Sequence, residues 1–68
     1  MVSARYRKVG EELGATSVIA QDDSIEYTWK EAKKLYRIVV YPRVCNSFST
    51  PEIKALLKDE LDFARLSQ

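Results

Sequence analysis

The chain contains no histidine and a single cysteine, Cys45, among its 68 residues. Histidine is the side chain that proteins use most often for general acid–base catalysis. A lone cysteine forms no disulfide within one chain, and without histidine it lacks both a base that would generate a thiolate and the companions of a zinc site. We therefore predict a protein that is not an enzyme and that binds no metal and no cofactor.

Glycine is scarce as well, with only Gly10 and Gly14 in the chain. Phosphate-binding loops need several glycines close together, so that the backbone can approach the phosphate groups. Asp22 and Asp23 are adjacent carboxylates that could bind a cation, but such a pair followed by serine is also ordinary turn chemistry. The sequence thus carries no motif that specifies a reaction.

Long apolar runs are absent too. No stretch approaches the roughly 18 apolar residues of a membrane-spanning helix. The first ten residues, M-V-S-A-R-Y-R-K-V-G, lack the apolar segment of a secretory signal. A free thiol in a chain of this kind suits a reducing compartment. We expect no membrane association and a cytoplasmic location.

The length of the chain predicts a single small domain over residues 1–68. A chain this short buries only about 60% of the surface that its unfolded form exposes. Small folds usually depend on disulfides, a bound metal or another subunit. Because the first two are excluded, we expect a protein partner, either a second copy in a homo-oligomer or the other subunits of a complex.

The clearest helix signal follows S-T-P-E at residues 49–52. Thr50 as the N-cap would place Pro51 at the first helical position, where its missing N–H costs nothing. Ser49 as the N-cap would instead form a capping box with Glu52. We favour the first alternative. At helical spacing the apolar side chains then share one broad face, which consists of Ile53, Leu56, Leu57, Leu61, Phe63 and Ala64.

This apolar face is wider than the roughly 100° that a helix needs to cover one sheet. Glu60 lies in the middle of it, and burial of an unpaired carboxylate is costly. One interpretation is that Glu60 pairs with Arg37 or Arg43 of the sheet. Another is that part of the face, with Leu56, Glu60 and Phe63, contacts a partner. A third is that a small core wraps more of the helix and leaves Glu60 at its edge.

Other elements are predicted upstream. T-W-K-E at residues 28–31 has the form of a capping box and predicts a short helix that leads into a strand near Arg37. S-V-I-A and I-E-Y-T flank Q-D-D-S, which predicts a β-hairpin. In the first fourteen residues, the spacing of Tyr6, Val9 and Leu13 favours a helix, although R-Y-R-K-V also fits a strand.

Together these signals predict an α+β fold. A small antiparallel sheet of about three strands packs against the C-terminal amphipathic helix, and a shorter helix precedes the last strand. The predicted core consists of Val18, Trp29, Ile38, Val40, Ile53, Leu57, Leu61 and Ala64.

Positive charge is concentrated in residues 28–45, although the net charge of the whole chain is only +1. In an extended strand, Arg37, Val39, Tyr41 and Arg43 would share one face, opposite Tyr36, Ile38, Val40 and Val44. Bases beside a stackable ring suit nucleic acid, whereas long basic side chains also cover the outer face of any half-buried strand. The candidate basic surface consists of Lys30, Lys33, Lys34, Arg37, Tyr41 and Arg43.

These observations predict a small non-catalytic binding module, a regulator or adaptor that docks onto a protein. The C-terminal helix would supply the contact through Leu56, Glu60 and Phe63, and the basic surface at residues 30–43 would select an acidic partner. The alternative is a nucleic-acid-binding protein that uses the basic, aromatic face of the strand.

Overall fold

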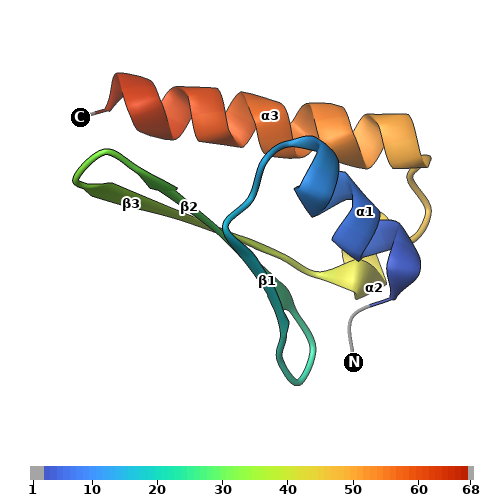
Figure 1. Cartoon of the computed structure of the whole chain (residues 1–68). Helices are drawn as coiled ribbons and strands as arrows, with labels where there is room; N and C mark the ends of the chain where they lie inside the picture. Colours follow the sequence, from blue (N-terminus) through green and yellow to red (C-terminus); the bar gives the residue numbers. More distant parts are fainter. Residues whose placement is uncertain (1–2, 68) are drawn as a thin grey trace.

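Three antiparallel strands form a sheet in the order β1-β2-β3, and two helices pack on one face of it (Figure 1). The structure, a computed structural model, describes residues 3–67. In chain order the elements are α1 (Ala4–Glu12), β1 (Ser17–Ala20), β2 (Ile25–Glu31), β3 (Lys34–Val40), α2 (Pro42–Cys45) and α3 (Thr50–Leu66). The α+β fold and the covering C-terminal helix are therefore confirmed.

The hairpin predicted around Q-D-D-S is present, because β1 and β2 pair from Ser17↔Thr28 to Ala20↔Ile25. The Gln21 N–H donates to the Ser24 carbonyl at 2.8 Å and closes the turn. The N-terminal segment is a helix, as favoured over a strand. Ser3 caps α1 by accepting a hydrogen bond from the Tyr6 N–H.

The position of the predicted short helix is wrong. A short helix, α1, does precede the last strand, but residues 28–31 belong to β2 and residues 34–36 to β3. A strand is favoured over the predicted helix because it buries both Tyr27 and Trp29, which lie two residues apart on one face of β2. The Trp29 indole N–H also donates to the Leu13 carbonyl at 3.0 Å. A helix through these residues would lose both arrangements.

The core lies between the sheet and the helices α1 and α3. Among the predicted core residues, Trp29, Val40, Ile53, Leu57 and Leu61 are buried, while Val18, Ile38 and Ala64 are half-buried against them. Six further buried residues are absent from the predicted core, namely Tyr6, Val9, Ile25, Tyr27, Tyr36 and Cys45. Two of these tyrosines have hydrogen-bonded hydroxyls, since Tyr6 donates to Asn46 Oδ1 at 2.7 Å and Tyr27 donates to the Tyr6 carbonyl at 2.9 Å. Burial of Tyr27 raises the pKa of its phenol to about 12.

α3 begins with the capping box, not with a Thr50 cap. The Glu52 N–H donates to the Ser49 hydroxyl, and the Ser49 N–H donates to the Glu52 carboxylate at 2.7 Å. From there α3 runs back along β3, because Arg65 near its end pairs with Glu31 at the far end of the β2–β3 hairpin (Figure 1). This course places one long side of α3 beside the free edge of the sheet.

Candidate functional site: a groove between α3 and the open edge of β3

β3 is an edge strand whose outer backbone groups have no strand beside them. A two-residue turn joins β2 to β3, so the closing pair Glu31↔Lys34 is of the hydrogen-bonded kind. Pairs alternate from there without a bulge, which leaves the N–H and C=O groups of Leu35, Arg37 and Val39 directed away from β2. The open edge of β3 thus offers backbone donors and acceptors along its length.

The side of α3 nearest this edge carries a stripe of exposed residues. Leu56, Glu60 and Phe63 are spaced four and three residues apart and lie on one side of the helix. The buried residues Ile53, Leu57 and Leu61 lie beside this stripe. Leu56 is 39% exposed and Phe63 is 68% exposed, so neither belongs to the core.

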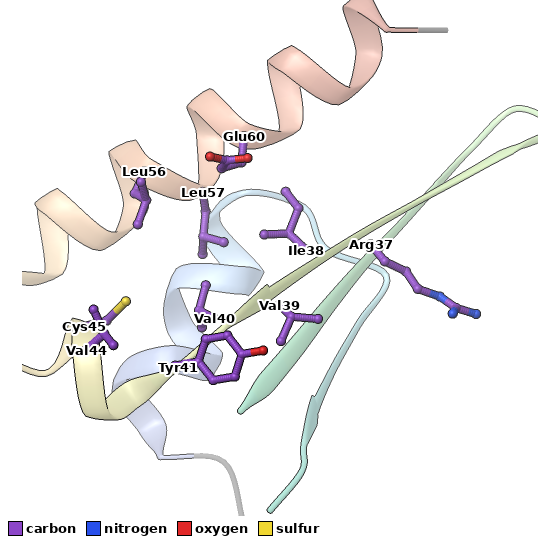
Figure 2. A pocket seen from close by; sticks show the side chains of 10 residues that line it. All are labelled: Arg37, Ile38, Val39, Val40, Tyr41, Val44, Cys45, Leu56, Leu57 and Glu60. Atoms are coloured by element: carbon purple, nitrogen blue, oxygen red, sulfur yellow. The ribbon is translucent and has the colours of Figure 1, made fainter. Parts of the chain in front are cut away.

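Between the stripe and the strand lies a groove of about 420 Å³, which we call the β3–α3 groove (Figure 2). Its floor is apolar and includes the buried residues Val40, Cys45 and Leu57. Its remaining lining comes from β3, from the segment that follows β3 and from the α3 stripe, namely Arg37, Ile38, Val39, Tyr41, Val44, Leu56 and Glu60. An apolar floor with a few polar groups at the rim is typical of a binding site.

The two charged residues of the groove do not pair with each other. In Figure 2 the Arg37 side chain extends away from α3, while Glu60 stays on the helix. Within residues 3–67, no ion pair includes Glu60, Arg37 or Arg43, so the pair suggested by the sequence is not formed. Other charged residues of α3 pair within the protein, as Lys54 does with Glu12 of α1 at 3.2 Å. Both charges of the groove are therefore available to an incoming group.

The predicted sites are partly brought together. Leu56 and Glu60 of the expected docking helix line the same groove as Arg37 and Tyr41 of the expected basic surface. Phe63 continues the α3 stripe beyond the residues that line the groove.

The remaining bases are scattered. Lys33 is in the β2–β3 turn and Lys34 begins β3, while Lys30 is on β2 and is exposed. Arg43 is not on the strand at all, because Pro42 starts α2, and it lines a separate hollow with Asp22 and Asp23. The prediction of one basic face through residue 43 is wrong, since the extended backbone ends before Pro42.

Sequence reasoning placed one residue of the groove wrongly, Val44, and another correctly, Val39. Val44 was assigned to the inner face with Val40, but it lies in α2 and is 63% exposed. Val39 was placed on the outer face, and it is 42% exposed there. The proline at position 42 was the signal that the strand pattern could not continue to Val44.

The outer face of the sheet is open and mixed in character. One row across it consists of Ile19, Glu26 and Val39, which are paired neighbours on the three strands. Ile19 is 49% exposed and Val39 is 42% exposed. No apolar layer covers these side chains in the part of the chain that is described, and apolar groups share this face with Glu26, Lys30 and Arg37.

Over the described range 3–67, no helix has the length and apolarity that crossing a bilayer requires. The same residues bring together no group of three or more histidine, cysteine, aspartate or glutamate side chains that could hold a metal ion. Comparisons of the chain with protein-family models, with curated proteins and with solved structures gave no match.

Proposed function

We propose that the protein is a small non-catalytic binding module, a regulator or adaptor, that docks onto other proteins by accepting an extended segment as an added strand. The segment would lie in the β3–α3 groove and hydrogen-bond to the open edge of β3. The observation that carries this proposal is the run of outward-directed backbone groups at Leu35, Arg37 and Val39, with a groove beside it. Addition of a strand to an exposed edge is a recurring way in which proteins recognise peptides.

The two edges of the sheet differ in a way that favours β3. β1 has four residues, whereas β3 has seven, and long unprotected edges are the ones that pair with other chains. Beside β3 the α3 stripe forms a second wall along the strand, so side-chain recognition is available there. Main-chain bonds would supply affinity, and the wall would supply selectivity.

Two further considerations agree with this proposal. A domain of this length gains stability from a partner, because ligand binding to the folded state shifts the folding equilibrium. Cys45 is a free, buried thiol, which fits a reducing compartment such as the cytoplasm.

Nucleic acid is the less favoured ligand. Phosphate binding needs clustered bases, but the groove contains Glu60 and the open face of the sheet contains Glu26. Arg43 lies beside Asp22 and Asp23 in the separate hollow. These carboxylates would repel a polyanion from surfaces on which the bases lie.

The test is a nuclear magnetic resonance titration with the uncharged, strand-forming peptide G-S-T-V-T-V-T-G-S at millimolar concentration. We expect the amide signals of Leu35, Arg37, Val39 and Leu56 to shift. Val39→Pro removes one outward N–H donor at a position where an edge strand tolerates proline, and it should weaken binding at least several-fold. Val39→Thr keeps the donor and a similar shape, and it should bind like the wild type.

If Val39→Pro does not fold, Leu56→Asp is the second variant. Leu56 is exposed on α3, on the side of the groove opposite β3, so this substitution should weaken binding without unfolding the protein. Shifts confined to other parts of the protein, or binding unaffected by both substitutions, would overturn the proposal. So would strong binding of a single-stranded oligonucleotide at near-physiological salt that is lost in Arg37→Ala and kept in Val39→Pro.

A further inference from the structure

We infer that the segment bound in the β3–α3 groove presents a lysine or arginine to Glu60, apolar side chains on either side of that base, and an acidic side chain to Arg37. This inference rests on the proposed function and adds the chemistry of the partner. It follows from the order of groups along the groove, from their spacing and from their charge.

The wall formed by α3 presents its groups in a fixed order along β3. α3 starts close to the end of β3 and ends near Glu31, so Leu56 comes first, Glu60 second and Phe63 third along the groove (Figures 1 and 2). Val44 and Tyr41 lie with Leu56 at the first position and make it apolar. A carboxylate thus stands between two apolar positions.

The spacing of Leu56 and Glu60 is close to that of a strand. Residues four apart on a helix rise about 6 Å along its axis. Side chains on one face of a strand recur every two residues, or about 6.8 Å. A bound strand that places an apolar side chain at Leu56 therefore places the side chain two residues on at Glu60. Phe63 follows Glu60 by three residues, so the residue two further on lies about 3 Å past Phe63 along the groove, within reach of its ring.

Side chains at the intervening positions of the bound strand point to the other face of the sheet. Arg37 lies on that face, and its side chain extends away from α3 (Figure 2). An acidic residue at an intervening position would lie beside Arg37, in the arrangement of a cross-strand pair. The expected pattern is apolar, acidic, basic, acidic, apolar.

Most other charges of α3 already have a partner, although Asp59, which does not line the groove, has none among the described residues. Lys54 pairs with Glu12, Lys58 pairs with Asp62, and Arg65 pairs with Glu31 and Asp62. In the described part of the chain, Glu60 and Arg37 are bound to no opposite charge. A partner that covers the groove must supply both counter-charges, because a buried unpaired charge is costly.

This requirement argues against a second copy of the chain as the occupant. The side chains that β3 directs toward α3 are Tyr36, Ile38 and Val40, and none of them could neutralise Glu60. Antiparallel pairing of two β3 edges would also bring Arg37 close to the same residue of the other copy. Like charges on neighbouring strands are destabilising. A partner of different sequence is therefore inferred.

The test compares two labelled peptides by fluorescence anisotropy, G-V-E-K-E-V-G and its charge-swapped form G-V-K-E-K-V-G. We expect the wild-type protein to bind the first about fivefold to tenfold more tightly at low salt, and less so at physiological salt. Glu60→Lys should reverse the preference. Asp59→Lys makes the same change of net charge at an exposed neighbouring position of α3 and should leave the preference intact.

Equal affinity of both peptides, with the uncharged peptide still bound in the groove, would overturn the inference and leave the proposed function standing. Failure of all three peptides to bind would remove both. A dimer in sedimentation equilibrium that is dissociated by Val39→Pro would overturn the inference in favour of a second copy.

Discussion

At the scale of single residues, Gly10 marks the closest approach of α1 to the sheet. A Cβ atom at this position would lie 2.6 Å from Val18 Cγ2 and 2.9 Å from Tyr27 Cε2. Tyr27 is fully buried, so its ring has little room to move away. Only glycine lets the helix rest against the sheet at this depth.

We expect Gly10→Ala to lower the free energy of unfolding by about 1–3 kcal/mol through this overlap, as measured by urea denaturation. Gly14→Ala is the matched control, because a Cβ there meets nothing within 4 Å and its cost comes from the backbone φ of +77° alone. Val18→Ala should relieve much of the Gly10→Ala loss and none of the Gly14→Ala loss. Additive effects in the first pair would contradict the proposed clash.

At the scale of elements, some parts of this fold were predictable from the sequence and others were not. The β1–β2 hairpin and α3 have strong local signals, namely a polar turn between β-branched runs and an apolar period that follows a cap. Their predicted positions are confirmed. In these segments local preference and tertiary packing favour the same structure.

Residues 28–36 show why local signals fail. The spacing of Thr28 and Glu31 is that of a capping box, yet the same residues form a strand. The strand is favoured because Trp29 is buried and donates a hydrogen bond to the Leu13 carbonyl. Leu13 is sixteen residues away, so this contact cannot be seen in the sequence around Trp29. The groove could not be predicted from the sequence for the same reason. It forms because α3 runs along β3, and the spacing of apolar residues in the sequence does not show this course.

The cap of α3 can be tested by substitution and by pH. Ser49→Ala removes the acceptor for the Glu52 N–H and should cost about 1 kcal/mol of stability at neutral pH. The hydrogen bond from the Ser49 N–H lowers the pKa of the Glu52 carboxyl. This contribution is therefore present above the ordinary pKa of glutamate and is lost as the pH falls through the lower folded value.

Glu52→Gln keeps an acceptor but does not titrate, so its stability should fall less on acidification than that of the wild type. Urea unfolding between neutral and acidic pH measures both effects. An unchanged acid dependence in Glu52→Gln would mean that other carboxylates, such as Glu31 beside Arg65, account for the acid sensitivity.

At the scale of the whole molecule, the core and the proposed docking surface occupy adjacent sides of one helix. Leu57 is fully buried against the sheet, whereas Leu56 next to it lies at the rim of the groove. The wide apolar face of α3 thus divides into a part that stabilises the fold and a part that contributes little to it. Stability and binding should therefore respond to different residues of α3.

Phe63→Asp is the substitution that separates the two roles. Because Phe63 is 68% exposed, we expect the free energy of unfolding to change by no more than about 0.5 kcal/mol, while peptide binding in the β3–α3 groove weakens several-fold. Leu57→Ala should instead cost about 2–5 kcal/mol, since this side chain is 0% exposed.

Leu66→Asp is the control for the new charge, because Leu66 is 83% exposed on the same helix but lies outside the stripe of Leu56, Glu60 and Phe63. Both aspartates lie near the C-terminal end of α3, where the helix dipole disfavours them to a similar degree. Leu66→Asp should therefore match Phe63→Asp in stability and the wild type in peptide binding. Equal loss of binding in the two variants would show that negative charge on α3, and not the apolar stripe, controls access to the groove.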